Sequence, residues 1–205
     1  MYAELFCQTN FSFLTGASQP EELIARADFL GYSALAITDE CSVAGIVRAY
    51  AEKRQQQLAV KLIIGSYFRL NDEFDCVLLC PNSAAYSELC RIITNARRRA
   101  TKGEYQLDEW DLKTIRHCLL IWLPSDNEQQ QHRWAKWLLR HHPANTWIGV
   151  QRLLLANESQ RIDSLQLLAE TYQLPICACT GVLMHEAERL PLQQVLTATR
   201  LGTTV

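Results

Sequence analysis

Residues 34–40 of the chain read Ala-Leu-Ala-Ile-Thr-Asp-Glu. The run that ends at Thr38 is short and continuously apolar, which is typical of a parallel strand buried on both faces. Asp39 and Glu40 follow directly, so two carboxylates stand at the carboxyl end of this strand. The stretch therefore predicts a buried sheet whose strand end carries polar groups.

A helix is predicted on the N-terminal side of this strand. Residues 18–21 (Ser-Gln-Pro-Glu) combine the spacing of a capping box with a proline in the first turn. Apolar residues then recur at helical spacing up to Leu30, and Gly31 ends the helix. Before it, residues 2–8 predict a short strand and residues 9–16 a loop.

The alternation of strand and helix continues towards the C-terminus. Helical patterns fall at residues 43–50, 84–98, 128–140 and 158–172. Apolar runs typical of strands fall at residues 61–64, closed by Gly65, and at 76–80, 118–123, 146–150 and 175–179. This order favours βαβ units and a mainly parallel α/β sheet, either an open doubly wound sheet or a closed barrel.

The composition describes a packed chain with almost balanced charge. Of 205 residues, 48% are hydrophobic and 20% charged, with 8 Gly and 6 Pro, which excludes a disordered or collagen-like chain. The net charge of −2 provides no overall positive field for a nucleic acid backbone. The start lacks the features of a signal peptide and no apolar run could span a membrane, so we expect a cytoplasmic protein without a membrane partner. Residues 197–205 leave a helical pattern without a polar tail, and we expect them to continue into a longer protein.

The cysteines do not suggest a disulfide framework or a zinc site. A chain of this length can bury a core unaided, so we expect its 8 cysteines to be reduced and mostly buried. No Cys-x-x-Cys pair occurs, and the spacings of Cys76 with Cys80 and of Cys177 with Cys179 are typical of small core residues in strands.

The positions at the strand ends, where βα-barrels carry catalytic groups, form a poor set of metal ligands. They are Phe6, Gln8, Asp39, Glu40, Tyr67, Gly181, Leu183 and His185. Dications need several carboxylates or neutral imidazoles that converge, and two adjacent carboxylates with one distant histidine cannot hold a multinuclear cluster. Glu40 could hold at most a single ion weakly. The sequence also has neither of the two common glycine-rich phosphate loops.

Five segments resemble, in order and spacing, the N-terminal PHP (polymerase and histidinol phosphatase) domain of bacterial C-family DNA polymerases. They are residues 2–23, 30–50, 62–70, 97–105 and 182–203. The sequence is more similar to the error-prone branch, which acts in translesion synthesis, than to the main replicative subunit. The resemblance implies an irregular (βα)7 barrel with mostly parallel strands. It also implies that residues 1–205 are a single PHP domain, the N-terminal fragment of a longer polymerase, and that the barrel is truncated at its C-terminus.

An active PHP domain binds up to three metals and hydrolyses phosphoesters, and this sequence departs from its ligand pattern. The ligand positions of the family are occupied here by Phe6, Gln8, Thr15, Glu40, Tyr67, Gly181 and Leu183. Asp39 and His185 match neighbouring family residues but not principal ligands. The resemblance therefore implies a degenerate domain that has no catalytic residue, binds no metal and needs no cofactor.

The leading interpretation is the PHP domain of an error-prone DNA-directed DNA polymerase, a nucleotidyltransferase that uses Mg²⁺. The domain itself would be a scaffold or protein-docking module. Its partners would be the catalytic region of the same polymerase and, through it, DNA, mutagenesis-cassette proteins and the sliding clamp. Two alternatives stay open: a metal-dependent phosphoesterase that uses Asp39, Glu40 and His185, and a stand-alone module that regulates a polymerase.

One basic run interrupts the otherwise mixed charge. It consists of Arg97, Arg98, Arg99 and Lys102 at the end of a predicted helix. Such charges complement the helix dipole, and they can also contact DNA or an adjacent polymerase domain. Both interpretations remain open.

Overall fold

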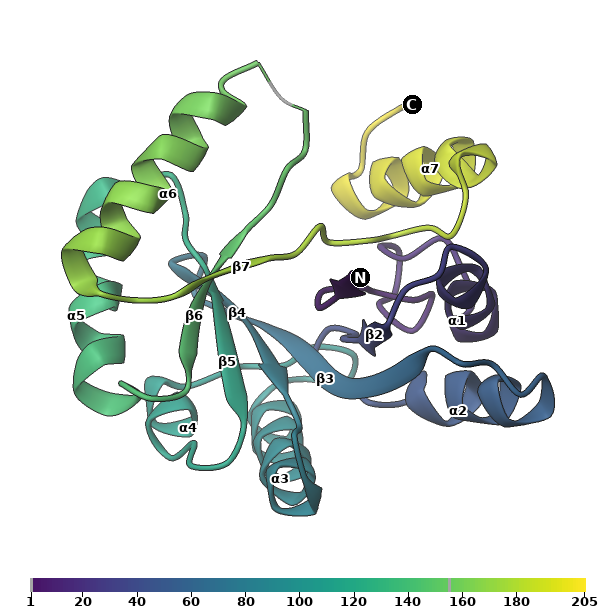
Figure 1. The fold of residues 1–205 in the computed structure, drawn as a ribbon, viewed down its shortest axis with the longest axis horizontal. Helices are drawn as coiled ribbons and strands as arrows, with labels where there is room; N and C mark the ends of the chain where they lie inside the picture. The colour runs from purple at the N-terminus through teal and green to yellow at the C-terminus, as the bar shows by residue number, and fades with distance from the viewer. Residues whose placement is uncertain (1, 155) are drawn as a thin grey trace. The chain divides into compact units, whose positions relative to one another are not determined.

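A computed structural model describes residues 2–154 and 156–205, which form two compact units (Figure 1). Unit 1 comprises residues 1–66 and 181–205, and unit 2 comprises residues 67–180. The strands are β1 (Ala3–Glu4), β2 (Ala34–Ile37), β3 (Lys61–Leu70), β4 (Phe74–Leu79), β5 (Leu119–Leu123), β6 (Thr146–Val150) and β7 (Ile176–Ala178). The helices are α1 (Pro20–Phe29), α2 (Ile46–Gln55), α3 (Ser83–Arg99), α4 (Glu109–Lys113), α5 (Glu128–His141), α6 (Glu158–Tyr172) and α7 (Leu190–Leu201), with a 3₁₀ turn at Ala187–Arg189.

The strands follow one another in the sheet in the order in which they occur in the chain. β1, β2 and β3 pair in parallel, and so do β5, β6 and β7. The predicted alternation and the mainly parallel sheet are thus confirmed.

β4 is the exception to the parallel order, because it pairs antiparallel with β5. Only residues 71–73 connect β3 to β4, which is too short for the crossover that a parallel neighbour needs. Asn71 and Asp72 both adopt positive φ, at 50° and 55°, and so reverse the chain within this turn. The expected end of β3 at Gly65 was wrong, since the strand continues to Leu70.

In unit 1, α1 and α2 pack their apolar stripes on the parallel strands. Leu23, Ile24 and Ala27 of α1 lie in one cluster with Leu35 and Ile37 of β2. The capping box of α1 lies one residue later than the sequence predicted. The backbone N–H of Gln19, rather than of Ser18, donates to the side chain at the third helical position, Glu22, at 2.8 Å.

In unit 2, an aromatic cluster joins the sheet to α5. Phe74 of β4 stacks on Trp122 of β5 at 6.3 Å between ring centroids, and its other neighbour is Trp134 of α5 at 4.6 Å. α3 buries residues at helical spacing, from Ala85 and Leu89 to Ile92 and Ala96. Loops, rather than these helix faces, follow the carboxyl ends of the strands.

Most of the cysteines are buried, as predicted. The buried ones are Cys7, Cys41, Cys76, Cys118 and Cys179, and the others are half-buried. Over residues 2–154 and 156–205, no helix has both the length and the apolar character needed to cross a membrane.

Candidate functional site

Asp39 is the centre of a hydrogen-bond network at the carboxyl end of β2. Its side chain is fully buried. Oδ1 accepts the backbone N–H of Thr9 at 2.7 Å and the hydroxyl of Ser12 at 2.8 Å, while Oδ2 accepts the hydroxyl of Thr9 at 2.9 Å. The carboxylate thus fastens the loop after β1 to the end of β2.

Ser12 extends this network to two further strand-end positions. Its hydroxyl oxygen accepts the backbone N–H of Glu40 at 3.0 Å and the side-chain amide of Gln8 at 3.4 Å. On the other side, the hydroxyl of Ser66 donates to the backbone carbonyl of Asp39 at 2.7 Å. Gln8, Asp39 and Glu40, which the sequence placed at strand ends, are therefore brought together by neutral hydroxyl groups.

The surroundings of Asp39 disfavour its charged form. Burial raises the pKa of Asp39 above its usual value, although the hydrogen bonds from Ser12 and Thr9 act in the opposite direction. Burial also raises the pKa of the neighbouring Cys7 thiol, and the carboxylates of Glu4 and Asp39 add to this effect. Negative charge is thus costly at this end of unit 1.

The network is closely packed against two glycines. A Cβ on Gly45 would lie 2.8 Å from Oδ2 of Asp39 and 3.2 Å from Oγ1 of Thr9. A Cβ on Gly16 would lie 2.0 Å from the carbonyl oxygen of Thr9. The loop can approach Asp39 this closely because neither position carries a side chain.

The late segment that contains Gly181 and Leu183 lies beside the continuation of β1. Val182 donates its N–H to the carbonyl of Phe6 and accepts the N–H of Gln8, both at 2.9 Å. The carbonyl of Leu183 accepts the N–H of Ala17 at 2.7 Å. The backbone groups at this strand end therefore already form hydrogen bonds with one another, and the side chain of Phe6 is buried.

The side chains that contact His185 differ from those that contact Asp39. Its Nδ1 lies 2.7 Å from the hydroxyl of Ser18, and its backbone N–H donates to the same oxygen at 3.0 Å. Its Nε2 lies 3.3 Å from a carboxylate oxygen of Glu186, and Glu22 lies 3.9 Å from Nδ1. These contacts join the start of α1 to the segment that leads into α7.

Two of the predicted positions lie outside the Asp39 network. The hydroxyl of Thr15 donates to the carbonyl of Phe13 within its own loop, at 3.4 Å. Tyr67 belongs to unit 2, where its hydroxyl donates to Asp75 at 2.8 Å and accepts from Arg69 at 3.2 Å. Burial, followed by the charge of Asp75, raises the pKa of Tyr67.

In the basic run at the end of α3, two of the four residues bind other groups of unit 2. Arg97 donates to the carbonyls of Gly103 and Glu104, at 3.1 and 3.2 Å. Arg99 forms a two-pronged ion pair with the buried carboxylate of Asp111. Arg98 and Lys102 are exposed. Half of the run thus stabilises unit 2 itself.

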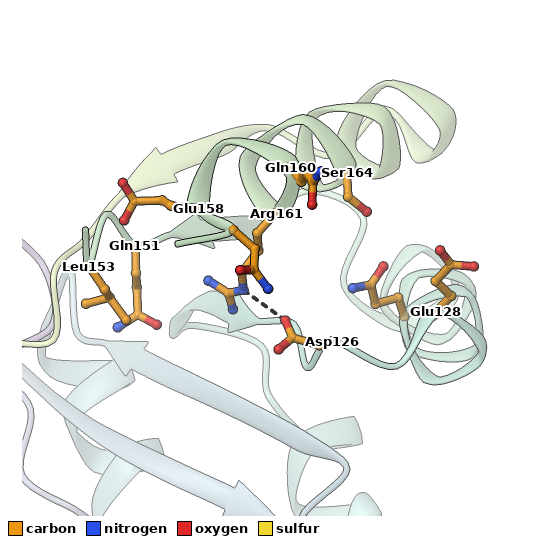
Figure 2. Close-up of a pocket in the computed structure, with 10 residues that line it drawn as sticks. Asp126, Glu128, Gln151, Leu153, Glu158, Gln160, Arg161 and Ser164 are labelled. Carbon is orange, nitrogen blue, oxygen red and sulfur yellow. Dashed lines mark hydrogen bonds and ion pairs between the residues drawn. The ribbon is translucent and has the colours of Figure 1, made fainter. Parts of the chain in front are cut away.

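Unit 2 also has a polar pocket where β5 and β6 end and α5 and α6 begin (Figure 2). Its volume is about 440 Å³. Arg161 donates to Asp126 across it at 2.9 Å, and Glu158 pairs with Arg152 at 3.4 Å. Three of the four charged lining residues, Asp126, Glu158 and Arg161, thus form ion pairs, and the lining includes no cysteine or histidine.

The sequence did not reveal the hydroxyl groups that surround Asp39. Thr9, Ser12 and Ser66 lie 27 or more residues from Asp39 in the sequence, so no local pattern marks them. The available signal was the occurrence of Thr9 and Ser12 in the turn-prone loop after the first strand. Hydroxyl residues in such loops commonly bond nearby polar groups.

Comparisons with known proteins agree with this fold. The family model of the PHP domain matches residues 4–144. The chain belongs to the PHP domain family. An amidohydrolase from Chromobacterium violaceum, solved with bound sulfate and no metal, has a TM-score of 0.61 at 14% identity, with 92% of this chain and 89% of that one covered. This likeness confirms the predicted fold class, an irregular α/β barrel of the PHP type.

The curated relatives of this PHP domain are much longer proteins. An error-prone DNA polymerase of Vibrio vulnificus strain CMCP6 is 60% identical over 204 residues, which cover 100% of this chain and 20% of the relative. An error-prone DNA polymerase of Methylococcus capsulatus is 50% identical over 204 residues, covering 98% of this chain and 19% of the relative. The chain spans about a fifth of the length of these polymerases.

The metal centre that an active PHP domain would hold does not fit these residues. Phe6, Gly181 and Leu183 offer no side-chain lone pair, and both oxygens of Asp39 already accept hydrogen bonds. Within the described parts of the chain, no three His, Cys, Asp or Glu side chains are grouped so that they could hold a metal ion.

Proposed function

We propose that this chain is the N-terminal PHP domain of an error-prone DNA-directed DNA polymerase. The polymerase is a nucleotidyltransferase that uses Mg²⁺ and template DNA, and it acts in DNA damage-induced mutagenesis and translesion synthesis. The observation that carries this proposal is the 60% identity, over the whole chain, to a protein named error-prone DNA polymerase. The chain covers the same share, about a fifth, of several such relatives.

Within that polymerase, the domain is a metal-free scaffold without a catalytic residue of its own. The hydrogen bonds that both oxygens of Asp39 accept and the apolar side chains of Phe6 and Leu183 support this role. A bound cation would have to displace Thr9 and Ser12, and with them the loop that they anchor. The full length of residues 1–205 serves as one PHP domain.

The proposed partner of the scaffold is the catalytic region of the same polymerase. α7 supports this assignment, since Leu192 and Val195, three residues apart and therefore on one face of that helix, are 42% and 50% exposed. Apolar side chains gathered on one helix are typical of a surface that another part of a protein covers. DNA, mutagenesis-cassette proteins and the sliding clamp are then reached through the polymerase, with Arg98 and Lys102 as candidate contacts of unit 2.

Primer extension tests the polymerase assignment. The full polypeptide encoded by the reading frame that contains these residues should extend a primed template when Mg²⁺ and deoxynucleotides are present. A Leu192→Asp change should reduce the yield of folded polymerase, while Asp163→Asn, at an exposed position of α6, should not. A folded full-length product that extends no primer would refute the proposal.

Metal content tests the scaffold assignment separately. The chain is purified without chelator, its metals are measured by elemental mass spectrometry, and its thermal unfolding is recorded with and without Mn²⁺ and Zn²⁺. A ligand that binds the folded state raises the melting temperature in proportion to RT ln(1 + [L]/Kd). We expect substoichiometric metal and an unchanged transition. Two or three ions per chain would contradict the scaffold and favour phosphoester hydrolysis.

A further inference from the structure

In unit 2, a cysteine follows the last residue of β4 and another precedes the first residue of β5, its antiparallel neighbour. The last pair of this ladder is Leu79 with Leu119. The next step of the same register places Cys80 opposite Cys118. Directly opposed residues of antiparallel strands have Cα atoms about 4.5–5.5 Å apart. This spacing lies within the range of about 4.4–6.8 Å that a disulfide requires.

The two thiols also interact as side chains. The interaction between the two thiols lowers the pKa of the Cys80 thiol, while burial and the charge of Glu88 act in the opposite direction. The same interaction, followed by burial, raises the pKa of Cys118, whose thiol donates to the carbonyl of Ala85. The pair therefore contains one thiol that ionises more readily and one that keeps its proton.

The two thiols also differ in accessibility, and this difference, like the difference in pKa, favours reaction at Cys80. Cys80 is half-buried, whereas Cys118 is fully buried, with its Sγ 3.3 Å from the carbonyl of Ala85. The backbone N–H of Cys118 donates to the carboxylate of Glu88 at 3.2 Å, which fixes the start of β5. A small reagent from solution thus meets Cys80 first, with Cys118 held directly behind it.

We propose that Cys80 and Cys118 form an oxidisable thiol pair that hydroperoxides convert into a disulfide between β4 and β5. The Cys80 thiolate attacks the O–O bond of hydrogen peroxide and becomes a sulfenic acid, and the departing hydroxide takes up a proton to form water. The sulfur of Cys118 then attacks the sulfenic sulfur. An S–S bond forms, the S–O bond breaks, and the Cys118 proton leaves with the hydroxide as a second water. Two thiols lose two electrons and the peroxide gains them.

Peptide mapping of the full chain under non-reducing conditions tests this site. After treatment with hydrogen peroxide, we expect a linked pair of peptides containing Cys80 and Cys118, two hydrogens lighter than the sum of the reduced peptides. The closed loop should raise the melting temperature, and dithiothreitol should reverse both changes. In the reduced protein, iodoacetamide should modify Cys80 more than about tenfold faster than Cys118, since thiolate fraction and access both favour Cys80.

Three variants separate the roles of the two thiols. Cys80→Ser should abolish the linked pair. Cys118→Ala should leave a sulfenic acid on Cys80 that dimedone traps. Cys90→Ser changes another half-buried cysteine of unit 2 and should leave the linked pair intact. The wild-type map decides the question even if Cys118→Ala fails to fold. The proposal is overturned if Cys80 pairs mainly with Cys90, or if Cys80 and Cys118 both remain open to alkylation after peroxide treatment.

Discussion

Two buried carboxylates organise loops in this PHP domain, one in each unit, with different kinds of donor. In unit 1, Asp39 accepts two hydroxyl groups and one backbone N–H, all from the loop after β1. In unit 2, Glu88 of α3 accepts three consecutive backbone N–H groups, those of residues 116–118 before β5. Each carboxylate holds a distant segment against a strand end.

The two sites differ in how they treat negative charge. At Asp39, burial prevails and the pKa is raised. At Glu88, burial alone would also raise the pKa, but the N–H groups of Arg116, Cys118 and His117 together hold it below its usual value. A row of backbone N–H dipoles is fixed by the fold and points at the charge, whereas hydroxyl groups can rotate and serve a neutral partner equally well.

This difference bears on the metal-free scaffold proposed for unit 1. A carboxylate binds a cation in its ionised form, and the surroundings of Asp39 oppose ionisation. The carboxylate of Asp39 instead belongs to the hydrogen-bond network of the loop after β1. In unit 2, the carboxylate that remains favourably charged lies on a helix and binds a backbone segment instead.

Removal of the Asp39 carboxylate should produce the largest loss of stability. In Asp39→Ala, the N–H of Thr9 and the hydroxyls of Thr9 and Ser12 lose their buried acceptor. Hydrogen bonds to charged groups contribute about 1.5–3 kcal/mol each and are not additive, so we expect a loss of about 3 kcal/mol or more in the free energy of unfolding. Urea denaturation measures it. Asp163→Ala, at an exposed carboxylate of α6, should change the value by less than about 0.5 kcal/mol. A loss below about 1 kcal/mol at Asp39 would show that its network is not a main support of unit 1.

Removal of the Glu88 carboxylate should have the next largest effect. Glu88→Ala leaves the N–H groups of residues 116–118 without their acceptor, but some of these lie nearer the surface and can bind water. We expect a loss of about 2 kcal/mol in the free energy of unfolding. Hydrogen exchange should show faster exchange of these three amides in particular. Unchanged protection of residues 116–118 would contradict the assigned role of Glu88.

A methyl group at Gly45 tests how closely the Asp39 network is packed. In Gly45→Ala, the new Cβ would meet Oδ2 of Asp39 at 2.8 Å, which forces the carboxylate or its loop to shift. Overpacking of this kind costs about 1–3 kcal/mol, and we expect the lower half of that range. In an Asp39→Ala background, the same change should cost much less, because the obstructing oxygen is gone. Equal costs in both backgrounds, measured as a double-mutant cycle, would place the clash elsewhere.

Local sequence patterns predicted the regular elements well. The helix at residues 158–172 and the strand at residues 146–150 have the expected bounds, because their periodicity and flanking polar residues are local features. The direction of β4 was missed. It depends on the turn at residues 71–73, where Asn71 and Asp72 adopt positive φ. These two residues favour a chain reversal, but the prediction relied on the apolar runs alone.

The site was predictable in position but not in structure. Asp39 and Gln8 were identified because they follow strands, and the family pattern indicated which ligands are replaced. What occupies the place of the ligands depends on the path of the loop, since Thr9 and Ser12 reach Asp39 across 30 and 27 residues. The pairing of Cys80 with Cys118 required the register of β4 and β5, which no local pattern contains.

The smallest effect, and the most direct test of the contrast between the two carboxylates, is the dependence of stability on pH. The pKa of Asp39 in the folded state lies above its usual 3.8, so the unfolded chain releases this proton at a lower pH than the folded protein does. The folded state therefore loses stability as the pH rises from 3.8 to the folded pKa. Glu88 has a folded pKa below its usual 4.5, so its stabilisation is complete above 4.5 and is lost as the pH falls through the folded pKa.

We therefore compare the free energy of unfolding of the wild type with that of each variant. The difference between wild type and Asp39→Asn should decrease as the pH rises above 3.8, and the difference between wild type and Glu88→Gln should decrease as the pH falls below 4.5. One proton limits either slope to about 1.4 kcal/mol per pH unit. Urea midpoints measured across this acidic range give both slopes. Slopes of the same sign would mean that hydroxyl groups stabilise a buried charge as well as backbone N–H groups do. In that case the Asp39 network would favour the charged carboxylate and would no longer argue against a cation.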